Sequence, residues 1–269
     1  MVSRPWEDFE IESTVAHAGR MYDYMLGGTT NFEVDRQACI EANAEFPGGI
    51  EAARAGLRAN RDFLGRAVRH IADAGIRQFL DLGTGIPSDD NTHAVALSVA
   101  PDSRIVYVDN DPIVLAHAHE LLRDTPESTA AYLFADMRDG RAILEEAAKT
   151  LDLSRPVGLV MVAILHFVTP EEDPYRLVSS LVDALAPGSY LAISHLASDI
   201  MAEEMDALYS RISERTKETF VLRSREEVTR FFDGLELVEP GVTLVSDWHT
   251  EPGDVELPVY AAVGRKPQP

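Results

Sequence analysis

The stretch FLDLGTGIPS, residues 79–88, runs from an apolar segment into a turn that contains two glycines. Such turns usually hold a nucleotide, because glycine lacks a Cβ and lets a ligand approach the backbone. The stretch matches the dinucleotide fingerprint G-x-G-x-x-G only in part, since Ser88 stands at the third glycine position. Asp81, two residues before the first glycine, also fits that fingerprint poorly. The sequence therefore predicts a strand, a glycine turn and a helix, but not a typical pyrophosphate site.

Apolar segments of strand length alternate with helical patterns through most of the chain. Short apolar strands that alternate with helices favour an α/β fold whose parallel sheet is covered on both faces. A short loop separates the last two strands, so we expect them to pair as an antiparallel hairpin at the sheet edge. Strands are predicted at 78–82, 104–109, 130–135, 157–164, 189–194, 235–245 and 257–263, and helices at about 90–99, 112–123, 140–150 and 174–186.

The amino-terminal part of the chain follows a different pattern. Residues 14–32 combine aromatic side chains with a Gly-Gly pair, and a long helix with one apolar face, interrupted only by Asn60, precedes the first strand. One interpretation is that residues 14–32 form a lid over the ligand, with Arg20 on a ligand carboxylate. The alternative is that Tyr22, Met25 and Phe32 anchor an amino-terminal helix to the core. The expected units are therefore an amino-terminal arm and helical lid over residues 1–75 and a Rossmann-like domain over residues 76–269.

The composition limits the possible partners. The chain has 24 Lys and Arg against 45 Asp and Glu, a formal net charge of −21, which opposes binding to nucleic acid or to an anionic membrane surface. Its longest apolar run, residues 157–168, is too short to span a bilayer. Cys39 is the single cysteine, so no internal disulfide or multi-cysteine metal site can form. We expect a cytoplasmic protein, a monomer or homodimer, that binds a small molecule.

The charges around the glycine turn favour a cationic ligand. Pro87 stands where a helix could begin, and Asp89 and Asp90 at that helix start would repel a phosphate. S-adenosylmethionine carries a sulfonium, an ammonium and only one carboxylate, so acidic loops suit it better than they suit a dinucleotide. The turn therefore points to S-adenosylmethionine as the cofactor.

The next two strands each end in an acid as well. Asp109 ends the second strand, where its carboxylate could accept hydrogen bonds from both ribose hydroxyls, and Asp136 ends the third, where it could accept one from the adenine amino group. Met137 would pack on the adenine ring. One acid at the end of each of three successive strands is the arrangement expected for this cofactor. The predicted cofactor-binding residues are Tyr22, Met25, Asn31, Asp81, Gly83, Thr84, Gly85, Asp109, Asn110, Asp136, Met137 and Ala163.

Several stretches also resemble one known family, a bacterial family of S-adenosylmethionine-dependent methyltransferases long described as a domain of unknown function. The resemblance extends over residues 14–264. It implies the class I methyltransferase fold, a seven-stranded sheet in the order 3-2-1-4-5-7-6 with strand 7 antiparallel, and S-adenosylhomocysteine as the product; it implies no particular acceptor. The stretches that carry it are RMYDYMLGGTTNFEVDR (20–36), FLDLGTGIPS (79–88), NTHAVA (91–96), RIVYVDNDPIVLAHA (104–118), RPVGLVMVAILHFV (155–168) and LAPGSYLAISHL (185–196).

Two histidines are candidates for the catalytic base that a protonated acceptor would need. His166 follows the fourth strand and His195 lies at the end of the fifth, and histidine has a suitable unperturbed pKa. The alternative for each is a structural histidine that hydrogen-bonds a loop carbonyl. No metal site is predicted, because the adjacent acids at 171–173 are typical of a helix start.

Three functions remain open at this point. The first is O- or N-methylation of a small molecule. The second is a protein that binds S-adenosylmethionine without catalysis, as a sensor or a partner subunit. The third, an NAD(P)-dependent oxidoreductase, is disfavoured by Ser88 and by the lack of a Tyr-x-x-x-Lys set.

Overall fold

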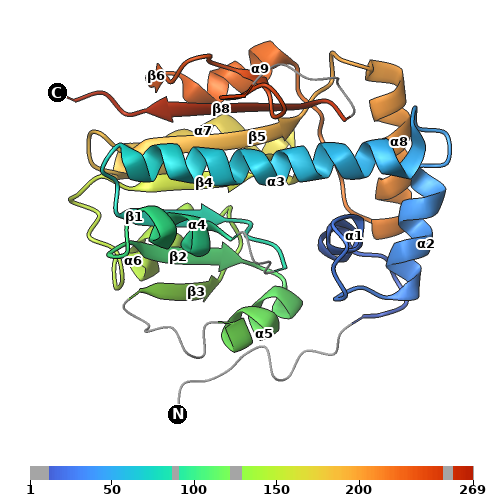
Figure 1. Ribbon diagram of the computed structural model, residues 1–269, viewed down its shortest axis with the longest axis horizontal. Coiled ribbons are helices and arrows are strands. Elements are labelled where there is room, and N and C mark those ends of the chain that lie inside the picture. The colour runs from blue at the N-terminus through green and yellow to red at the C-terminus, as the bar shows by residue number, and fades with distance from the viewer. Residues whose placement is uncertain (1–11, 87–90, 122–128, 251–256, 269) are drawn as a thin grey trace.

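One mixed sheet forms the centre of the molecule (Figure 1). The computed structural model describes residues 12–86, 91–121, 129–250 and 257–268. The strand order is β3-β2-β1-β4-β5-β8-β6, and β7 also pairs with β8. The strands are β1 (Gln78–Leu82), β2 (Arg104–Asp109), β3 (Ala130–Phe134), β4 (Gly158–Val162), β5 (Tyr190–Leu196), β6 (Glu236–Leu237), β7 (Thr243–Leu244) and β8 (Val259–Arg265).

The carboxyl-terminal edge of the sheet confirms the predicted topology and corrects one strand. The last strand, β8, pairs antiparallel with β5 and separates it from β6, which is the predicted order with an antiparallel final strand. The strand expected at 235–245 is instead two short strands, β6 and β7, both antiparallel to β8. Between them Pro240 has no N–H to donate and Gly241 takes a φ of +83°, so the pairing is interrupted.

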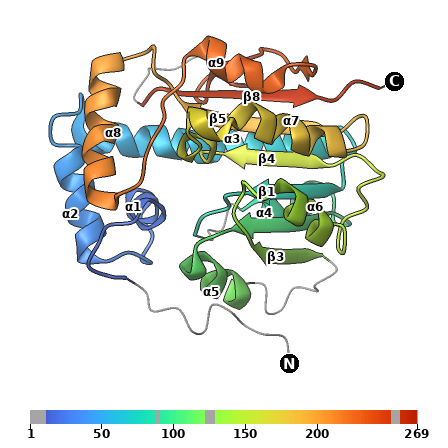
Figure 2. The ribbon, with the colours of Figure 1, turned by 180° about the vertical axis from the view of Figure 1, so that it is seen from behind.

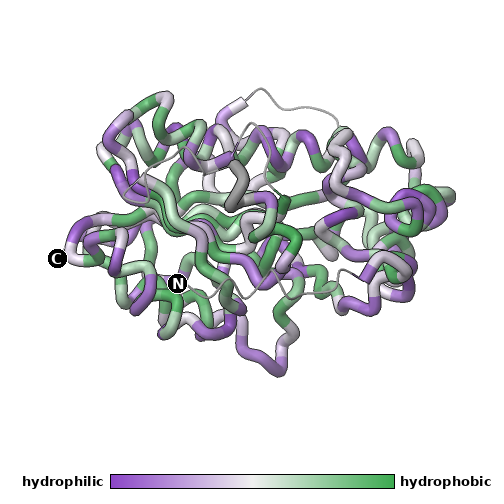
Figure 3. Tube along the Cα trace, turned by 90° about the horizontal axis from the view of Figure 1, so that it is seen from below, coloured by the Kyte–Doolittle hydropathy of each residue, from purple (hydrophilic) through white to green (hydrophobic). Residues whose placement is uncertain are grey.

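Helices cover both faces of the sheet, as the predicted alternation requires (Figures 1 and 2). Phe79 of β1 belongs to the cluster that packs against α3 (Gly49–Asp73) and α4 (Thr92–Val99). Leu80, the next residue, belongs to the cluster under α6 (Gly140–Ala147) and α7 (Pro174–Ala184). This alternation buries β1 along its whole length, which explains its apolar sequence. Figure 3 shows the hydrophobic residues concentrated along the strands in the middle of the molecule.

Four helices meet beyond the carboxyl ends of the parallel strands (Figure 1). They are α1 (Ala18–Met25), α2 (Glu33–Ala42), the amino-terminal half of α3, and α8 (Ala202–Thr216). The first three lie within the helical region expected over residues 1–75, whereas no helix is expected where α8 forms. The remaining elements are α5 (Pro112–Leu121), α9 (Arg225–Thr229), η2 (Leu165–Phe167), η3 (Pro170–Glu172) and η4 (Arg230–Phe232). Within the described part of the chain, no helix has the length and apolarity needed to cross a bilayer.

Candidate active site

A cavity of about 1000 Å³ lies between the carboxyl ends of β1, β2, β4 and β5 and the four helices α1, α2, α3 and α8. Small-molecule pockets span about 300–1000 Å³, so this cavity has room for a nucleotide-sized molecule and a second small one. Ten of the twelve predicted cofactor-binding residues line it: Tyr22, Met25, Asp81, Gly83, Thr84, Gly85, Asp109, Asn110, Met137 and Ala163.

The glycine turn after β1 has the conformation that its sequence predicts. Gly83 and Gly85 have φ values of +73° and +65°, in the left-handed region that favours glycine. A Cβ at Gly83 would lie 2.4 Å from the side chain of Ile164, so the turn passes too close to the loop after β4 for a larger residue. A Cβ at Gly85 would meet no atom within 4 Å. The backbone at Gly85 therefore borders open space in the cavity.

Asp109 ties the turn to the end of β2. Its Oδ2 accepts a hydrogen bond from the Gly85 N–H at 2.9 Å, and its Oδ1 accepts one from the Asp111 N–H at 2.9 Å. Burial raises the pKa of this carboxyl, although the backbone hydrogen bonds oppose that effect. Each carboxylate oxygen can accept a further hydrogen bond. Asp109 is therefore held in place with acceptor capacity left for a ligand on the cavity wall.

Asp81 is a second acid on the same wall, and it is almost fully buried. Thr92 Oγ1 donates a hydrogen bond of 2.6 Å to its Oδ2. Burial raises the pKa of Asp81 to about 6, because a charge there is removed from water. A cation placed beside Asp81 would favour the charged carboxylate, so the position suits an ammonium better than a phosphate.

The loop after β4 approaches the turn with a strained residue. Ala163 has a φ of +55°, and a left-handed conformation costs a residue with a Cβ roughly 1–2 kcal/mol. Its N–H donates to Ser194 Oγ at 2.9 Å, which holds the loop against β5. Strained backbone of this kind clusters at functional sites.

Two predicted cofactor-binding residues, Asn31 and Asp136, are not among the residues that line the cavity. Asn31 Nδ2 donates to Asp23 Oδ2 at 2.8 Å, and its Oδ1 accepts from Arg36, so it holds the turn between α1 and α2. Asp136 is half exposed and pairs with Arg138 at 3.1 Å. Arg138, which does line the cavity, is also paired with Glu172 at 2.6 Å.

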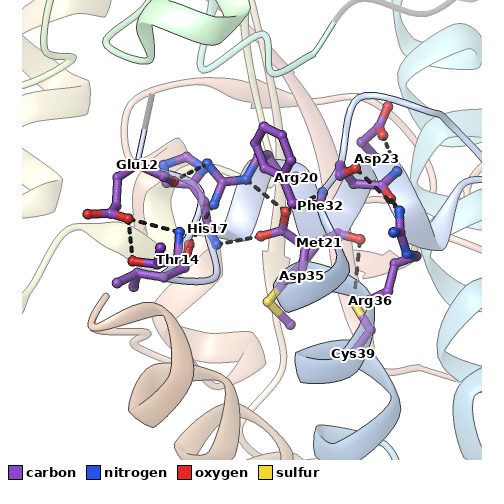
Figure 4. Close-up of polar contacts among 12 residues, drawn as sticks. Glu12, Thr14, His17, Arg20, Met21, Asp23, Phe32, Asp35, Arg36 and Cys39 are labelled. Carbon is purple, nitrogen blue, oxygen red and sulfur yellow. Dashed lines mark hydrogen bonds and ion pairs between the residues drawn. The ribbon is translucent and has the colours of Figure 1, made fainter. Parts of the chain in front are cut away.

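Arg20 does not line the cavity and so does not reach a ligand carboxylate there, contrary to the expectation. Its guanidinium pairs with the fully buried Asp35 at 2.8 Å and donates to the carbonyl oxygens of Glu12 and Val15 (Figure 4). The guanidinium also lies over the ring of Phe32, 5.0 Å from its centroid. This cluster joins α1 to α2 and fixes the position of the lid.

The structure separates the two candidate histidines. His195 is fully buried: its Nδ1 lies 2.9 Å from the Leu196 carbonyl oxygen and its Nε2 lies 2.7 Å from Arg223 Nη1. Because Arg223 can only donate, Nε2 accepts and the ring is neutral, with the proton on Nδ1. Burial and the Arg223 charge lower the pKa of His195 to about 3. Its two nitrogens are therefore occupied by the protein itself.

His166 keeps one ring nitrogen unbonded. It lies on the cavity wall, only 6% exposed, and its Nδ1 has no hydrogen-bond partner. Burial, with smaller contributions from His195 and Arg223, lowers the pKa of His166 well below its usual range. His166 is thus neutral at physiological pH and retains an unused nitrogen.

Some lining residues are missed by sequence reasoning. Asn43 at the end of α2, Tyr209 of α8 and Glu218 after α8 all contribute to the wall. They come from segments with no motif, and the helix that carries Tyr209 is not predicted. Asn60 gives a signal, since it is the polar residue on the apolar face of α3, and it too lines the cavity. Among the described residues, no three His, Cys, Asp or Glu side chains are grouped as metal ligands.

The strand order, the glycine turn and the acid at the end of β2 define a Rossmann-like methyltransferase fold. The chain belongs to the S-adenosyl methyltransferase family, whose model matches residues 4–267.

Two solved structures are similar to the whole chain. A DUF574 family protein from Streptomyces avermitilis is 44% identical, with 96% of this chain and 100% of that one covered and a TM-score of 0.89. A protein from Thermobifida fusca, provisionally assigned as a methyltransferase, is 40% identical, with 94% and 96% covered and a TM-score of 0.86. A protein of Mycolicibacterium smegmatis, provisionally assigned as an S-adenosyl-L-methionine-dependent methyltransferase, is 34% identical over 134 residues, which are 48% of this chain and only 42% of that relative.

Proposed function

We propose that the protein binds S-adenosylmethionine and transfers its methyl group to the oxygen or nitrogen of a small molecule. The observation that carries this proposal is the hydrogen bond between the Gly85 N–H and Asp109, which joins the glycine turn to the end of β2 at one side of a cavity with room for a second molecule. Membership of the S-adenosyl methyltransferase family supports it.

The donors and acceptors on this wall fit the cofactor. Asp109 has acceptor capacity for the ribose hydroxyls, the buried Asp81 would be stabilised in its charged form by the ammonium, and the open space at Gly85 admits a ligand beside the backbone. Met137 and Asn110, which also line the cavity, would border the adenine, and Ala163 would contribute backbone from the opposite loop. When bound, the cofactor supplies a methyl group on a sulfonium, which is an electrophile with a good leaving group.

The chain itself would supply orientation and, for a protonated acceptor, a base. A cavity bordered by four helices would hold the acceptor in one place, and such positioning accounts for most of the catalysis expected in this displacement. His166 is neutral and lies on the cavity wall, so its imidazole can receive the proton that a hydroxyl or amine loses. His195 would hold the loop of His166 in position through Arg223, which donates to the carbonyl oxygens of Leu165 and Val168.

Cofactor binding without catalysis is the second candidate. The low pKa of His166 makes it a weak base, and His195 is engaged by Arg223, so neither histidine is a strong proton acceptor. Such a protein would bind S-adenosylmethionine and respond to it through the four helices. An acceptor panel distinguishes the two functions.

The cofactor assignment predicts that Asp109→Ala weakens binding of S-adenosylhomocysteine. Loss of hydrogen bonds to a charged acceptor costs about 1.5–3 kcal/mol, so the dissociation constant should rise about 10- to 150-fold. Isothermal titration calorimetry of the wild type, of Asp109→Ala and of the exposed control Asp233→Ala measures this, with NADH and NADPH as competing ligands. An unchanged dissociation constant for Asp109→Ala, or tighter binding of a nicotinamide nucleotide, would contradict the assignment.

The proton-transfer role predicts that His166→Ala lowers turnover by about 10²- to 10⁴-fold, the usual worth of a positioned base. Its affinity for S-adenosylhomocysteine should stay close to wild type, and the exposed control His117→Ala should behave as wild type. The measurement is radiolabelled methyl transfer to a panel of phenols and amines. A His166→Ala variant with full activity per folded molecule and reduced thermal stability would make His166 structural. Tight cofactor binding by the wild type without transfer to any acceptor would favour the second candidate.

A further inference from the structure

The half of the cavity away from the glycine turn is enclosed by helices and is mainly apolar. On α3 the lining residues include Ala53, Leu57 and Leu64, which recur at helical spacing on one face. On α8 the corresponding face carries Leu208 and Ile212. A wall of this composition interacts poorly with water, so it binds an apolar ligand most favourably.

A row of aromatic rings connects this helical half to His166. The ring of Tyr209 lies 5.2 Å from that of Phe220, and Phe220 stacks on His166 at 5.3 Å with an interplanar angle of 20°. Phe167 lies 4.4 Å from His166 and 4.9 Å from Phe220. All four residues line the cavity. Rings at these separations offer faces and edges to another ring, so the row suits a planar ligand beside His166.

Two asparagine side chains on the helical wall have an amide oxygen that accepts no hydrogen bond. Asn60 donates to the Tyr22 hydroxyl at 3.1 Å, but its Oδ1 is buried and accepts no hydrogen bond. Asn43 donates to the Cys39 carbonyl oxygen, and its Oδ1 is likewise buried without a partner. A buried acceptor without a donor costs about 1–3 kcal/mol, so a ligand that brings a donor recovers that energy.

Charged side chains are few in the helical half, and each makes a hydrogen bond within the protein. Among the described residues, Asp23 and Arg61 are the charged side chains that the four helices contribute to the wall. Asp23 accepts from Asn31, and Arg61 donates to Asn91 Oδ1 at 3.2 Å. Burial also raises the pKa of both Tyr22 and Tyr209, so these hydroxyls stay neutral. An ion placed among these residues would lose its hydration and meet at most one opposite charge, which already makes a hydrogen bond within the protein, so the composition of this wall favours a neutral ligand.

Two further acids on the wall, Asp111 and Glu218, lie 3.4 Å from the two ring nitrogens of His17. His17 precedes α1, Asp111 follows β2 and Glu218 follows α8. These acids therefore form the contact between the lid and the nucleotide side of the cavity, and they are separate from the asparagine and tyrosine side chains of the helical half.

We propose that the helical half of the cavity holds the methyl acceptor, and that this acceptor is a neutral, largely apolar ring compound with an O–H or N–H donor. The donor bonds to the amide oxygen of Asn60, with Asn43 as a second acceptor, and the ring lies along Tyr209, Phe220 and His166. Its role as methyl acceptor rests on the proposed methyl transfer, whereas the binding site itself does not.

Four naphthalene probes of nearly equal size test the proposal by calorimetric or NMR titration, with and without saturating S-adenosylhomocysteine. 2-Naphthol is neutral and has a donor, 2-methoxynaphthalene has none, 2-naphthoate is an anion and 2-naphthylmethylammonium is a cation. We expect 2-naphthol to bind about ten-fold more tightly than the methoxy compound, as one hydrogen bond to a buried acceptor allows. Both ionic probes should bind more weakly than 2-naphthol.

Substitutions on the helical wall locate the site. Asn60→Leu should bring the affinity ratio of 2-naphthol to 2-methoxynaphthalene close to one, through loss of 2-naphthol affinity alone. Leu57→Trp should abolish binding of both, because the indole fills the helical half, while Arg58→Trp on the exposed side of the same helix should change neither. Thermal unfolding shows which variants fold. If Asn60→Leu does not fold, the affinities for 2-naphthol and 2-methoxynaphthalene are measured with Tyr209→Phe, which keeps the ring.

The outcomes separate this proposal from the proposed function. Equal affinity for 2-naphthol and its methyl ether, tighter binding of the cation or anion, or an unaffected ratio in Asn60→Leu would each overturn the inferred acceptor class. Donor-dependent binding of 2-naphthol without any binding of S-adenosylhomocysteine would support the site and overturn methyl transfer. Binding of S-adenosylhomocysteine without donor dependence would leave methyl transfer standing and refute the acceptor class.

Discussion

The buried pair of His195 and Arg223 determines which histidine can take part in chemistry. Arg223 is 3% exposed and donates to His195 Nε2 and to the carbonyl oxygens of Leu165 and Val168. These carbonyl groups flank His166 in the chain. A neutral His195 accepts a hydrogen bond from the guanidinium, whereas a protonated one would place two cations side by side in the core. His195 therefore fixes the loop of its neighbour and stays unprotonated.

This pairing predicts a dependence of stability on pH. Folding lowers the pKa of His195 from an unperturbed 6.5 to about 3, so below pH 6.5 the unfolded chain binds a proton that the folded chain does not. The neutral ring makes its full contribution to the free energy of unfolding above pH 6.5. This contribution falls by up to about 1.4 kcal/mol for each pH unit between 6.5 and 3. Chemical denaturation at pH values from 4 to 7 measures how the free energy of unfolding changes with pH. In His195→Gln this change per pH unit should be smaller than in the wild type by that amount. An identical slope in the variant would mean that His195 does not titrate on unfolding.

Sequence reasoning reaches the residues of the turn but cannot rank the histidines. Asp81, Gly83, Gly85 and Asp109 end two adjacent parallel strands, and strand ends are placed together by the pairing of the sheet. His195 also ends a strand, yet its role depends on Arg223, 28 residues further along the chain and brought back by folding. Local patterns carry no information about such a partner.

Among the elements, α3 connects the fold to the site. Its 25 residues extend from the sheet to α2 and α8, so the carboxyl-terminal part packs on β1 while the amino-terminal part lines the cavity (Figure 1). The apolar stripe of α3 is visible in the sequence because one face is buried along its whole length. Asn60 interrupts that stripe at the cavity, where its amide donates a hydrogen bond to the Tyr22 hydroxyl.

The sequence predicts the strands closely but does not predict α8, and the extent of burial explains both outcomes. Strands β1 and β2 are buried on both faces, which leaves a continuous apolar run in the sequence. Helix α8 packs mainly on α2 and buries only Met205, Leu208, Tyr209 and Thr216 among many charged residues. Its composition therefore resembles that of a solvent-exposed segment. The helical half of the site is correspondingly harder to predict than the nucleotide half.

At the scale of the whole molecule, the amino-terminal helices border the cavity and are anchored to the rest of the chain. The buried Arg20–Asp35 pair joins α1 to α2, and the contacts of His17 with Asp111 and Glu218 join the start of α1 to the nucleotide side. Side chains of α1, including Met21, Tyr22 and Met25, line the cavity. A movement of α1 relative to β2 and α8 would widen access to the cavity, and it would break the 3.4 Å contacts of His17 with Asp111 and Glu218.

A ligand in the cavity should consequently slow the opening of the lid. Contacts to Asp109 on one side and to Tyr22 on the other would tie α1 to the sheet, and a ligand that binds only the closed form stabilises it by mass action. Hydrogen–deuterium exchange of residues 14–32 should therefore slow on addition of S-adenosylhomocysteine, while α7, which contributes nothing to the described cavity wall, should exchange as before. The Asp109→Ala variant at the same ligand concentration should show less protection. Equal exchange of residues 14–32 with and without ligand, in a protein shown to bind it, would make α1 a fixed structural helix rather than a lid.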